Sequence, residues 1–446
     1  MLVEAVLLVG PVVYAAVWAW LRGGLAAAFP LGSATGAATS GGFPPRPNLS
    51  VAVTGGNPPS LMVPVAGPAG LSHCSVLPVA EPGGNPPDVA APATETADIS
   101  HAHAPLLSVL IAARDEAAAL PHLLAALRHQ TLAPALFEVL IADDHSADGT
   151  AALVAKAAET MPFALRLLRL PPGTTGKKAA LAAAIAQARA PWVACTDADC
   201  RPGPGWLQAY ADLLQAHQLT SSPAPHFISG PVRLTPGGAW FDGLLGLEFA
   251  GLVGVGGACI ARGWPTMCNG ANLAFRRATF HEVGGYADNA GVASGDDEFL
   301  LHKMHQRYPA GIYFLADARA VVDTPAPATL RALLRQRVRW ASKYPHYRTQ
   351  APRQLALLVL GANLSLALGL LLAFVWPALG PWVAAGWVLK LGADAWLLAP
   401  VLRLLRRLRW LAWLLPLQML YAPYALAVGL AGQRAKGYQW KGRQVR

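Results

Sequence analysis

The sequence predicts an α/β domain with a mainly parallel sheet, flanked by transmembrane helices. Three observations predict it. Short apolar runs typical of strands alternate with helical stretches between residues 106 and 196, long apolar runs lie towards both ends of the chain, and charged residues are few. Of the 446 residues, 54% are hydrophobic and 13% are charged, whereas a water-soluble domain usually has about 25% charged residues. We therefore expect much of the chain to contact lipid.

The net charge of +10 comes from basic clusters late in the chain, within residues 331–348, 403–409 and 434–446. Basic clusters beside apolar runs favour the anionic cytoplasmic face of a membrane, so we expect an integral protein of the cell membrane with its α/β domain on the cytoplasmic side. The basic and aromatic residues do not form one interleaved surface, and no nucleic-acid partner is expected. The five cysteines are odd in number and lack CxxC spacing, which indicates neither a zinc site nor a disulfide framework.

Residues 1–22 are predicted to form an N-terminal transmembrane anchor. Their apolar run contains only Glu4 as a charged residue before Arg22, and about 20 such residues cross the bilayer core. A cleaved signal peptide is the alternative, but the run lacks a basic start and an A-x-A cleavage site. Residues 23–104 are rich in Pro, Gly, Ala and Ser and have no apolar periodicity, which predicts a disordered linker.

Residues 105–350 are predicted to form the α/β domain. Strands are expected at 107–113, 137–142, 165–170 and 192–196, and helices at 117–129, 150–160 and 177–190. Because strands that alternate with helices imply right-handed crossovers, most strands should be parallel. Ligands bind at the carboxyl ends of the strands in such sheets, and polar motifs follow several of these strands.

Residues 351–432 are predicted to be a membrane region of two to three spans, at 355–376, 383–402 and 411–430. Pro416 and Pro423 interrupt the last of these, so a re-entrant or interfacial hairpin remains the alternative to a third span. Residues 433–446 form a basic tail. Three C-terminal spans would place this tail outside the cell, against the positive-inside tendency, so its side is left open.

Asp197 and Asp199 follow the predicted strand 192–196. Two carboxylates spaced i, i+2 at a strand end can turn toward one point. Mg²⁺ and Mn²⁺ prefer oxygen ligands that they share with substrate phosphates, and such a metal neutralises charge on a departing diphosphate. The alternative is an ordinary solvated turn, in which Asp is common.

Other polar residues follow the first two predicted strands. Arg114 and Glu116 end the first strand, and Asp143 and Asp144 end the second. Acidic groups there can accept hydrogen bonds from a nucleobase or a ribose, although Ser146 or Asp148 could simply cap the next helix. The segment 173–178 then supplies glycines and two lysines near phosphates, but its spacing is not that of a Walker P-loop.

Two motifs lie further along the chain. Asp296, Asp297 and Glu298 concentrate negative charge, so one carboxylate can have a raised pKa and act as a general base; an acidic first helical turn is the alternative. In the pentapeptide 336–340, Arg339 can hold a diphosphate, and Trp340 can form a wall for a sugar ring. An interfacial amphipathic helix is the alternative for this motif.

With these motifs in this order, residues 106–340 resemble family 2 glycosyltransferases of the GT-A fold, a Rossmann-like α/β fold. The resemblance is to the membrane branch with a QxxRW motif, which includes cellulose, chitin, hyaluronan and poly-N-acetylglucosamine synthases and ceramide glucosyltransferase. It implies inverting transfer from a nucleotide-sugar, usually a UDP-sugar, to a lipid or growing glycan, with Mg²⁺ or Mn²⁺ as cofactor. A non-processive lipid glycosyltransferase and a polysaccharide synthase both remain open.

The resemblance also implies roles for individual residues. It places the nucleoside at Arg114, Glu116, Asp143 and Asp144, and the diphosphate near Lys178, Asp197 and Arg339, with the metal on Asp199 and Asp197. It places the donor sugar and acceptor beside Asn269, Gly270, Asn272, Gln336 and Trp340. Asp297 matches the catalytic base, but Asp296 replaces the family's glutamate before it, which leaves open which acid removes the proton.

A non-catalytic transporter or scaffold is the rival from another class. Transporters usually carry ionisable residues inside their spans. Here Lys390 and Asp394 are the inner candidates, and their i, i+4 spacing allows them to pair with each other. The sequence therefore favours the enzyme.

Overall fold

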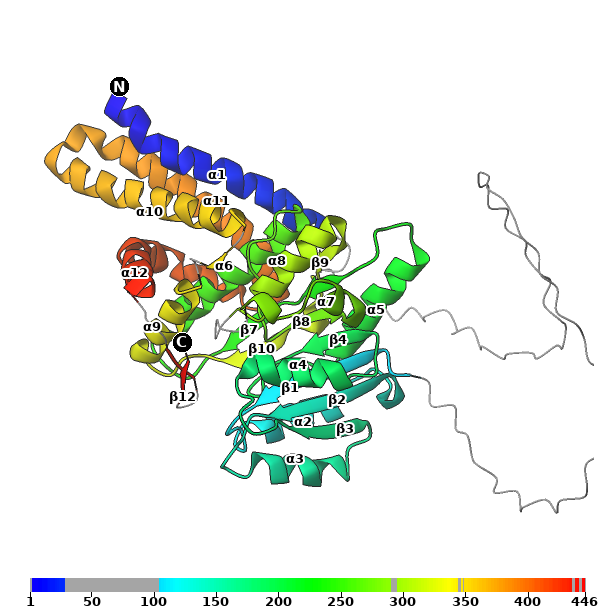
Figure 1. Cartoon of the computed structure of the whole chain (residues 1–446). Helices are drawn as coiled ribbons and strands as arrows, with labels where there is room; N and C mark the ends of the chain where they lie inside the picture. The colour runs from blue at the N-terminus through cyan, green and yellow to red at the C-terminus, as the bar shows by residue number, and fades with distance from the viewer. Residues whose placement is uncertain are drawn as a thin grey trace, which may run out of the picture. The chain divides into compact units, whose positions relative to one another are not determined.

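The computed structural model describes residues 2–28, 104–289, 295–343, 346–347, 349–434, 438–440 and 443–445 (Figure 1). Almost all of the predicted linker lies outside the described residues. Helix α1 spans Leu2–Ala28, so it continues beyond the predicted end of the anchor at residue 22.

The core of the α/β domain is a seven-stranded sheet in the order β3-β2-β1-β4-β8-β6-β9. The strands span Ala164–Arg169, Phe137–Asp143, Leu107–Ala113, Trp192–Cys195, Leu273–Arg276, Phe227–Ser229 and Ile312–Phe314 in that order. Neighbouring strands are parallel except around β8, which runs antiparallel to both β4 and β6. The predicted mainly parallel sheet is confirmed.

Two smaller sheets complete the strand content of the described residues. In the first, β10 (Val322–Pro325) lies between β5 (Arg201–Pro202) and β7 (Val232–Thr235). In the second, β11 (Tyr438–Trp440) pairs with β12 (Arg443–Val445) near the C-terminus.

Helices cover both faces of the large sheet, so its strands β1, β2 and β4 are buried on both sides. Leu107, Val109 and Ile111 of β1 pack on the side of α2 (Leu120–Arg128) and α5 (Trp206–Leu219). Leu110 faces the other side, which α4 (Lys177–Gln187) and α8 (Glu298–Arg307) cover. Strands with two buried faces carry near-continuous apolar runs, and this pattern made β1, β2 and β4 predictable. The short helices α3 (Thr150–Ala158) and α7 (Arg277–Glu282) connect further strands.

Helix α2 begins later than the predicted residue 117, and the reason lies in the loop before it. The backbone N–H of Ala117 donates to Asp148 Oδ2 at 2.9 Å, and that of Glu116 donates to Thr150 Oγ1 at 2.9 Å. These groups bond to the neighbouring loop after β2 rather than entering a helix. The residues predicted to form the first turn of the helix therefore belong to a loop that is hydrogen-bonded to the loop after β2.

Five helical segments among the described residues are long and apolar enough to cross a membrane: 8–28, 242–261, 351–375, 377–404 and 408–432. The last three contain α10 (Ala351–Val375), α11 (Gly380–Leu404) and α12 (Leu414–Arg434), so the predicted C-terminal runs are helices. Helix α6 (Asp242–Ala261) was not predicted as a candidate span. It lies within the predicted α/β domain and packs against α1 and α11.

The prolines of the last segment do not produce a hairpin. Pro416 lies in the first turn of α12, where its missing N–H is not needed, and Pro423 lies inside a continuous helix. Helices α1, α10 and α11 lie side by side, whereas α12 runs across them (Figure 1). In the described residues the last segment is therefore one continuous helix rather than a hairpin, and it is long and apolar enough to be a third span.

A buried polar cluster joins three of these helices. Lys390 Nζ lies 2.8 Å from Asp394 Oδ2, so the pairing expected from their spacing is confirmed. Tyr14 of α1 donates to Asp394 Oδ1 at 2.5 Å, and Gln418 of α12 accepts from Lys390 at 2.5 Å and donates to Asp394 at 2.7 Å. The cluster therefore ties α1, α11 and α12 together through one ion pair.

We expect Asp394→Leu to destabilise the protein strongly, because it leaves the Lys390 ammonium buried without a counter-ion. Removing one partner of a buried ion pair costs about 3–5 kcal/mol, whereas replacing both partners with apolar residues is often nearly neutral. The thermal unfolding midpoint of the detergent-purified protein should fall in Asp394→Leu and recover largely in the double variant Lys390→Met/Asp394→Leu. Equal losses in the two variants would contradict this account.

Candidate active site

The carboxyl ends of β1, β2 and β4 lie side by side. Ala113 at the end of β1 is in register with Asp143 at the end of β2, and Leu110 is in register with Cys195 at the end of β4. The loops that follow therefore place Arg114, Asp144 and Asp197 at the same edge of the sheet, as the sequence predicts for parallel strands.

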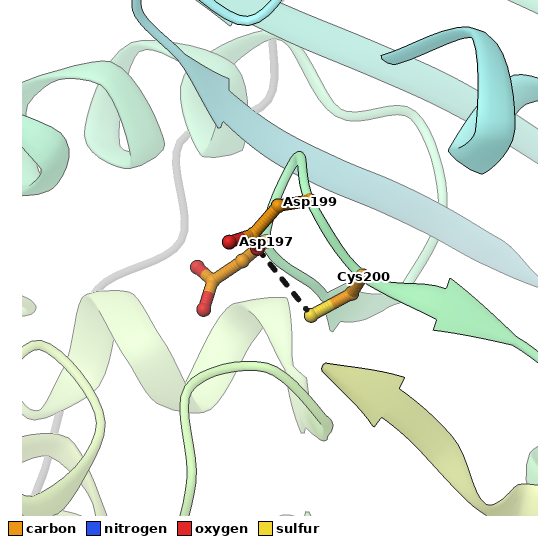
Figure 2. A group of neighbouring side chains, drawn as sticks. All are labelled: Asp197, Asp199 and Cys200. Carbon is orange, nitrogen blue, oxygen red and sulfur yellow. Dashed lines mark hydrogen bonds between the residues drawn. The ribbon is translucent and has the colours of Figure 1, made fainter. Parts of the chain in front are cut away.

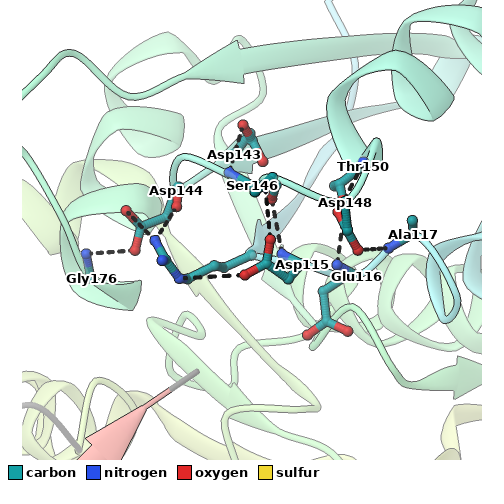
Figure 3. A network of polar contacts seen from close by, with 11 residues as sticks. Asp115, Glu116, Ala117, Asp143, Asp144, Ser146, Asp148, Thr150 and Gly176 are labelled. Carbon is teal, nitrogen blue, oxygen red and sulfur yellow. Dashed lines mark hydrogen bonds and ion pairs between the residues drawn. The ribbon is translucent and has the colours of Figure 1, made fainter. Parts of the chain in front are cut away.

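The loops after β1 and β2 form one hydrogen-bonded network (Figure 3). Arg114 donates to the carbonyl oxygen of Asp144 at 2.8 Å, and its guanidinium lies 3.9 Å from the Asp144 carboxylate. The backbone N–H of Gly176, before α4, donates to Asp144 Oδ2 at 2.9 Å. Asp144 is fully buried, so within this network it holds the segment before α4 against the ends of β1 and β2.

Asp143 and Glu116 face two different spaces. Asp143 is buried, and its Oδ1 atom has no hydrogen-bond partner among the described residues. Asp143 lines a small cavity of about 370 Å³ together with His145, Ser146 and Arg169. A buried acceptor without a donor is costly, so this oxygen fits an N–H or O–H of a ligand. The Glu116 carboxylate turns away from the network (Figure 3) and lines a larger cavity.

Asp148 has the structural role that the sequence left open. Its Oδ1 accepts from the backbone N–H and hydroxyl of Thr150, at 3.1 and 2.6 Å, and its Oδ2 accepts from Ala117. Ser146 Oγ likewise accepts from the backbone N–H of Asp115 at 2.9 Å. These two side chains hold the loops in place.

Asp197 and Asp199 lie in the loop after β4, next to Cys200 (Figure 2). One ligand atom from each of the three residues lies within 4.8 Å of the others. Burial, with the two carboxylates adding to it, raises the pKa of the Cys200 thiol well above its usual value. Cys200 therefore stays protonated, and its thiol donates to Asp199 Oδ1 at 3.8 Å. The two carboxylates fit Mg²⁺ or Mn²⁺, whose other ligands would come from phosphates and water, and the thiol does not.

Lys177, the first of the two lysines in segment 173–178, bridges the two acidic motifs. Its ammonium lies 2.8 Å from Asp197 Oδ1 and 3.1 Å from Asp296 Oδ2. Burial opposes its charge, but Asp197 and Asp296 outweigh this and hold its pKa well above the usual value. The cation therefore lies between the candidate metal pair and the candidate base.

Lys178, the predicted diphosphate residue, has different contacts. Its ammonium donates to the carbonyl oxygen of Asn289 at 2.6 Å and lies 5.4 Å from the centre of the Phe299 ring. Burial lowers the pKa of Lys178 to about 8. Consecutive helical residues point about 100° apart. Of the two lysines that begin α4, Lys177 is the one whose ammonium contacts the pair Asp197 and Asp199, here called the DxD pair.

The structure also distinguishes Asp297 from Asp296. Asp297 accepts from the backbone N–H groups of Gly270 at 2.9 Å and Glu298 at 2.8 Å, so it also caps α8. Burial raises the pKa of Asp297, and the Glu298 and Asp296 carboxylates add to this while Lys343 opposes it. For Asp296, the ion pair with Lys177 overcomes burial and lowers the pKa. Asp297 is therefore the better candidate for a base, because Asp296 is held as the partner of Lys177.

Asn269 and Gly270 line the larger cavity, but Asn272 does not. Asn272 is fully buried. Its Oδ1 accepts from Trp206 and Tyr210, each at 2.8 Å. Its Nδ2 donates to the carbonyl oxygens of Pro231 and Ala320, each at 2.8 Å. All of its polar capacity is used inside the domain, so we correct the expected pocket role of Asn272 to a structural one.

The larger cavity has a volume of about 950 Å³ and reaches from the sheet into the helices. Near the sheet its lining includes Asp197, Asp199, Asp296 and Asp297. Helix α9 (Leu330–Ala341) contributes Gln336, Arg339 and Trp340, so the structure brings the QxxRW motif to the same space. Among the helices its lining is largely apolar and includes Trp18, Leu247, Leu355, Leu397 and Leu417.

Matches to two family profiles show that the protein is a glycosyltransferase. Residues 108–252 match the profile of glycosyl transferase family 2, and residues 192–426, just over half of the chain, match that of glycosyl transferase family group 2. The chain therefore belongs to the family 2 group of glycosyltransferases.

The chain is also similar to several solved structures. The mannosyltransferase PcManGT from Pyrobaculum calidifontis, in complex with GDP-Man and Mn²⁺, is 20% identical. That match covers 74% of this chain and 86% of that chain, with a TM-score of 0.45. Residues 1–349 of S. aureus TarS are 16% identical, with 76% and 95% of the two chains covered and a TM-score of 0.39. No curated protein matches the chain.

Proposed function

We propose that the protein is a membrane-bound, inverting glycosyltransferase that moves a sugar from a nucleotide-sugar to a hydroxyl group of a lipid. One observation carries the proposal: a single cavity contains the DxD pair, the candidate base and an apolar space between candidate membrane helices. A largely apolar lining favours a lipid over a growing glycan. The glycan is the second candidate and is an outcome of the test below.

On the donor side, the proposal assigns the small cavity beside Asp143 to the base of a UDP-sugar. The unpartnered Oδ1 atom of Asp143 is suited to accept the N–H of a uracil ring. Arg114 holds the Asp144 loop that closes this region, and Arg339 lines the larger cavity where the diphosphate would lie. Lys177 is a better candidate than Lys178 for a contact with the diphosphate, because its ammonium already lies beside Asp197.

In the proposed reaction, Asp297 accepts the proton of the acceptor hydroxyl as that oxygen attacks the anomeric carbon. A single displacement of this kind inverts the configuration of the carbon. Mg²⁺ or Mn²⁺ held by Asp197 and Asp199 would neutralise charge on the departing nucleoside diphosphate. Arg339 adds a guanidinium on the leaving-group side, and Trp340 forms a wall of the cavity near the acceptor.

We further propose the cell membrane as the location, with the α/β domain on the cytoplasmic side. Arg262 at the end of α6 donates to the carbonyl oxygen of Trp20 in α1 at 2.7 Å, and the Trp20 and Trp264 rings lie 6.1 Å apart. Arg22 lies 5.7 Å from the ring centre of Trp396 in α11. Arg262 follows the last residue of α6, and Arg22 follows the apolar run at residues 2–21. Tryptophan and arginine together beside apolar runs are typical of the headgroup level, and basic residues favour the cytoplasmic side.

The purified full-length protein tests this function directly. It should be incubated with membrane lipids, a panel of nucleotide-sugars and Mn²⁺ or Mg²⁺, and the organic and aqueous products analysed by mass spectrometry and gel. A lipid that carries one or a few sugars supports the proposal. A ladder of long polysaccharide would replace the lipid acceptor with a glycan, and the absence of turnover with every donor would favour a non-catalytic role.

The acid limb of the pH–rate profile should move to lower pH in Glu298→Gln. The Glu298 carboxylate helps to raise the pKa of Asp297, so a neutral glutamine should lower that pKa. Asp297 would then stay ionised, and able to accept a proton, at lower pH than in the wild type. The measurement is kcat/KM for the acceptor as a function of pH. The control is Glu159→Gln, the same substitution at an exposed glutamate. A limb that stays in place or moves upward in Glu298→Gln would contradict Asp297 as the base.

A further inference from the structure

We propose that Glu248 of α6 and Arg337 of α9 form a positioning pair that fixes Gln336 and Trp340 in the acceptor part of the cavity. The inference rests on the proposed function, because it assigns a task to side chains beside the proposed acceptor. It adds a contribution from α6, a helix with no predicted role in the site.

The pair is geometrically well defined. Arg337 is only 4% exposed. Its Nε donates to Glu248 Oε1 at 3.1 Å, and a terminal nitrogen donates to Glu248 Oε2 at 2.5 Å. This is a bidentate arginine–carboxylate contact, which fixes orientation as well as distance.

Arg337 also contacts two residues of the QxxRW motif. Its other terminal nitrogen donates to Gln336 Oε1 at 2.7 Å, and its guanidinium carbon lies 4.4 Å from the centre of the Trp340 ring. A guanidinium over an indole face is a favourable cation–π contact. The orientation of Gln336 and Trp340 therefore depends on an arginine that Glu248 holds in place.

Two further contacts strengthen this arrangement. Phe249, which follows Glu248 on α6, packs against Trp340 with ring centres 6.3 Å apart. Tyr424 of α12 donates to Glu248 Oε1 at 3.2 Å. Helices α6 and α12 therefore both help to hold the QxxRW motif of α9 in place. All of these side chains line the same cavity.

The position of Glu248 argues against a random surface ion pair. It is the only acidic residue of α6 beyond the first residue, Asp242, in a helix that is otherwise apolar. A carboxylate in such a helix is costly and is usually kept for a function or a specific partner. By contrast, Arg331 and Arg335 of α9 are exposed, so charge on that helix alone does not require a buried counter-ion.

The expected result is a selective loss on the acceptor side. Glu248→Gln keeps the size of the side chain but removes the charge that holds Arg337, so Trp340 should lose its fixed orientation. A small misplacement of a group that positions a substrate can lower turnover by about 100-fold. We expect kcat to fall about 10- to 100-fold and the acceptor KM to rise, while the donor KM and the slow hydrolysis of donor without acceptor stay near the wild-type values.

A double-mutant cycle tests the pair, with Glu248→Gln measured alone and combined with Trp340→Ala. If Glu248 acts through Trp340, the second substitution should add little to the loss caused by the first. Arg337→Lys should resemble Glu248→Gln, because lysine cannot make the bidentate contact. The matched control is Arg335→Lys on the exposed side of α9, which should leave the rates unchanged.

Two outcomes would overturn the positioning role. The first is that the fold-losses in transfer rate caused by Glu248→Gln and Trp340→Ala multiply in the double variant. The second is that donor hydrolysis and sugar transfer fall equally in Glu248→Gln, as expected from general unfolding. If Glu248→Gln does not fold, Tyr424→Phe removes only one hydroxyl and should show a smaller loss of the same kind. The cycle is measured with whichever acceptor the wild-type protein uses, so a glycan product would overturn the lipid proposal without deciding the positioning pair.

Discussion

Asp297→Asn should lower the rate of sugar transfer by about 10²- to 10⁴-fold, the usual contribution of a general base. Asparagine has nearly the same shape, and its carbonyl oxygen can still accept one of the two backbone hydrogen bonds from Gly270 and Glu298. It cannot take a proton from the acceptor. The loss should therefore appear in kcat, with a donor KM close to that of the wild type.

The comparison with Asp296→Asn separates the two neighbouring acids. Asp296 holds Lys177, which also contacts Asp197 on the donor side. Its removal should act mainly on the donor and raise the donor KM, with a smaller effect on kcat. Thermal unfolding of both variants controls for misfolding. Turnover like that of the wild type in Asp297→Asn, or a larger loss of kcat in Asp296→Asn, would move the base to another residue.

The strands and the polar motifs that follow them could be predicted from the sequence, because each depends on residues that are close together in the chain. Strands buried on both faces carry continuous apolar runs, and β1 spans Leu107–Ala113 as predicted. The polar residues after β1, β2 and β4 meet because parallel strands place their carboxyl ends at one edge. The DxD pair and the Asp143–Asp144 pair could therefore be identified from the strand pattern, and the QxxRW motif from its resemblance to the family.

The other features of the site could not be predicted, because they depend on the direction in which a side chain points or on contacts with residues far away in the chain. The step from Lys178 to Lys177 is one residue, but it turns the side chain about 100° around α4. Asn272 matched a motif, yet its neighbours Trp206 and Tyr210 come from α5 and make it structural. The partner of Arg337 lies 89 positions earlier in the chain. The one local signal for it was a single glutamate in the middle of the apolar helix α6.

Removal of the metal should abolish most of the sugar transfer. The variant Asp199→Asn should show whether the Asp199 carboxylate holds the metal. Metal stabilisation of a leaving group is worth several kcal/mol, so we expect a loss of about 10²- to 10³-fold in transfer with EDTA, restored by Mn²⁺ or Mg²⁺. In Asp199→Asn the metal concentration for half-maximal rate should rise, because an amide oxygen is a weaker ligand than a carboxylate.

The neighbouring thiol supplies the control for this prediction. Cys200 is close enough to the two carboxylates to be a third metal ligand. Burial, however, raises the pKa of its thiol and keeps it protonated at neutral pH. Cys200→Ser should therefore leave the metal dependence of the rate unchanged, whereas Asp199→Asn shifts it. A changed metal preference in Cys200→Ser, or an unchanged metal dependence in Asp199→Asn, would show that the ion is not held by the carboxylate pair. Because Lys177 already places a cation beside Asp197, the same titration in Lys177→Met should show tighter metal binding if the ammonium and the metal compete for that carboxylate.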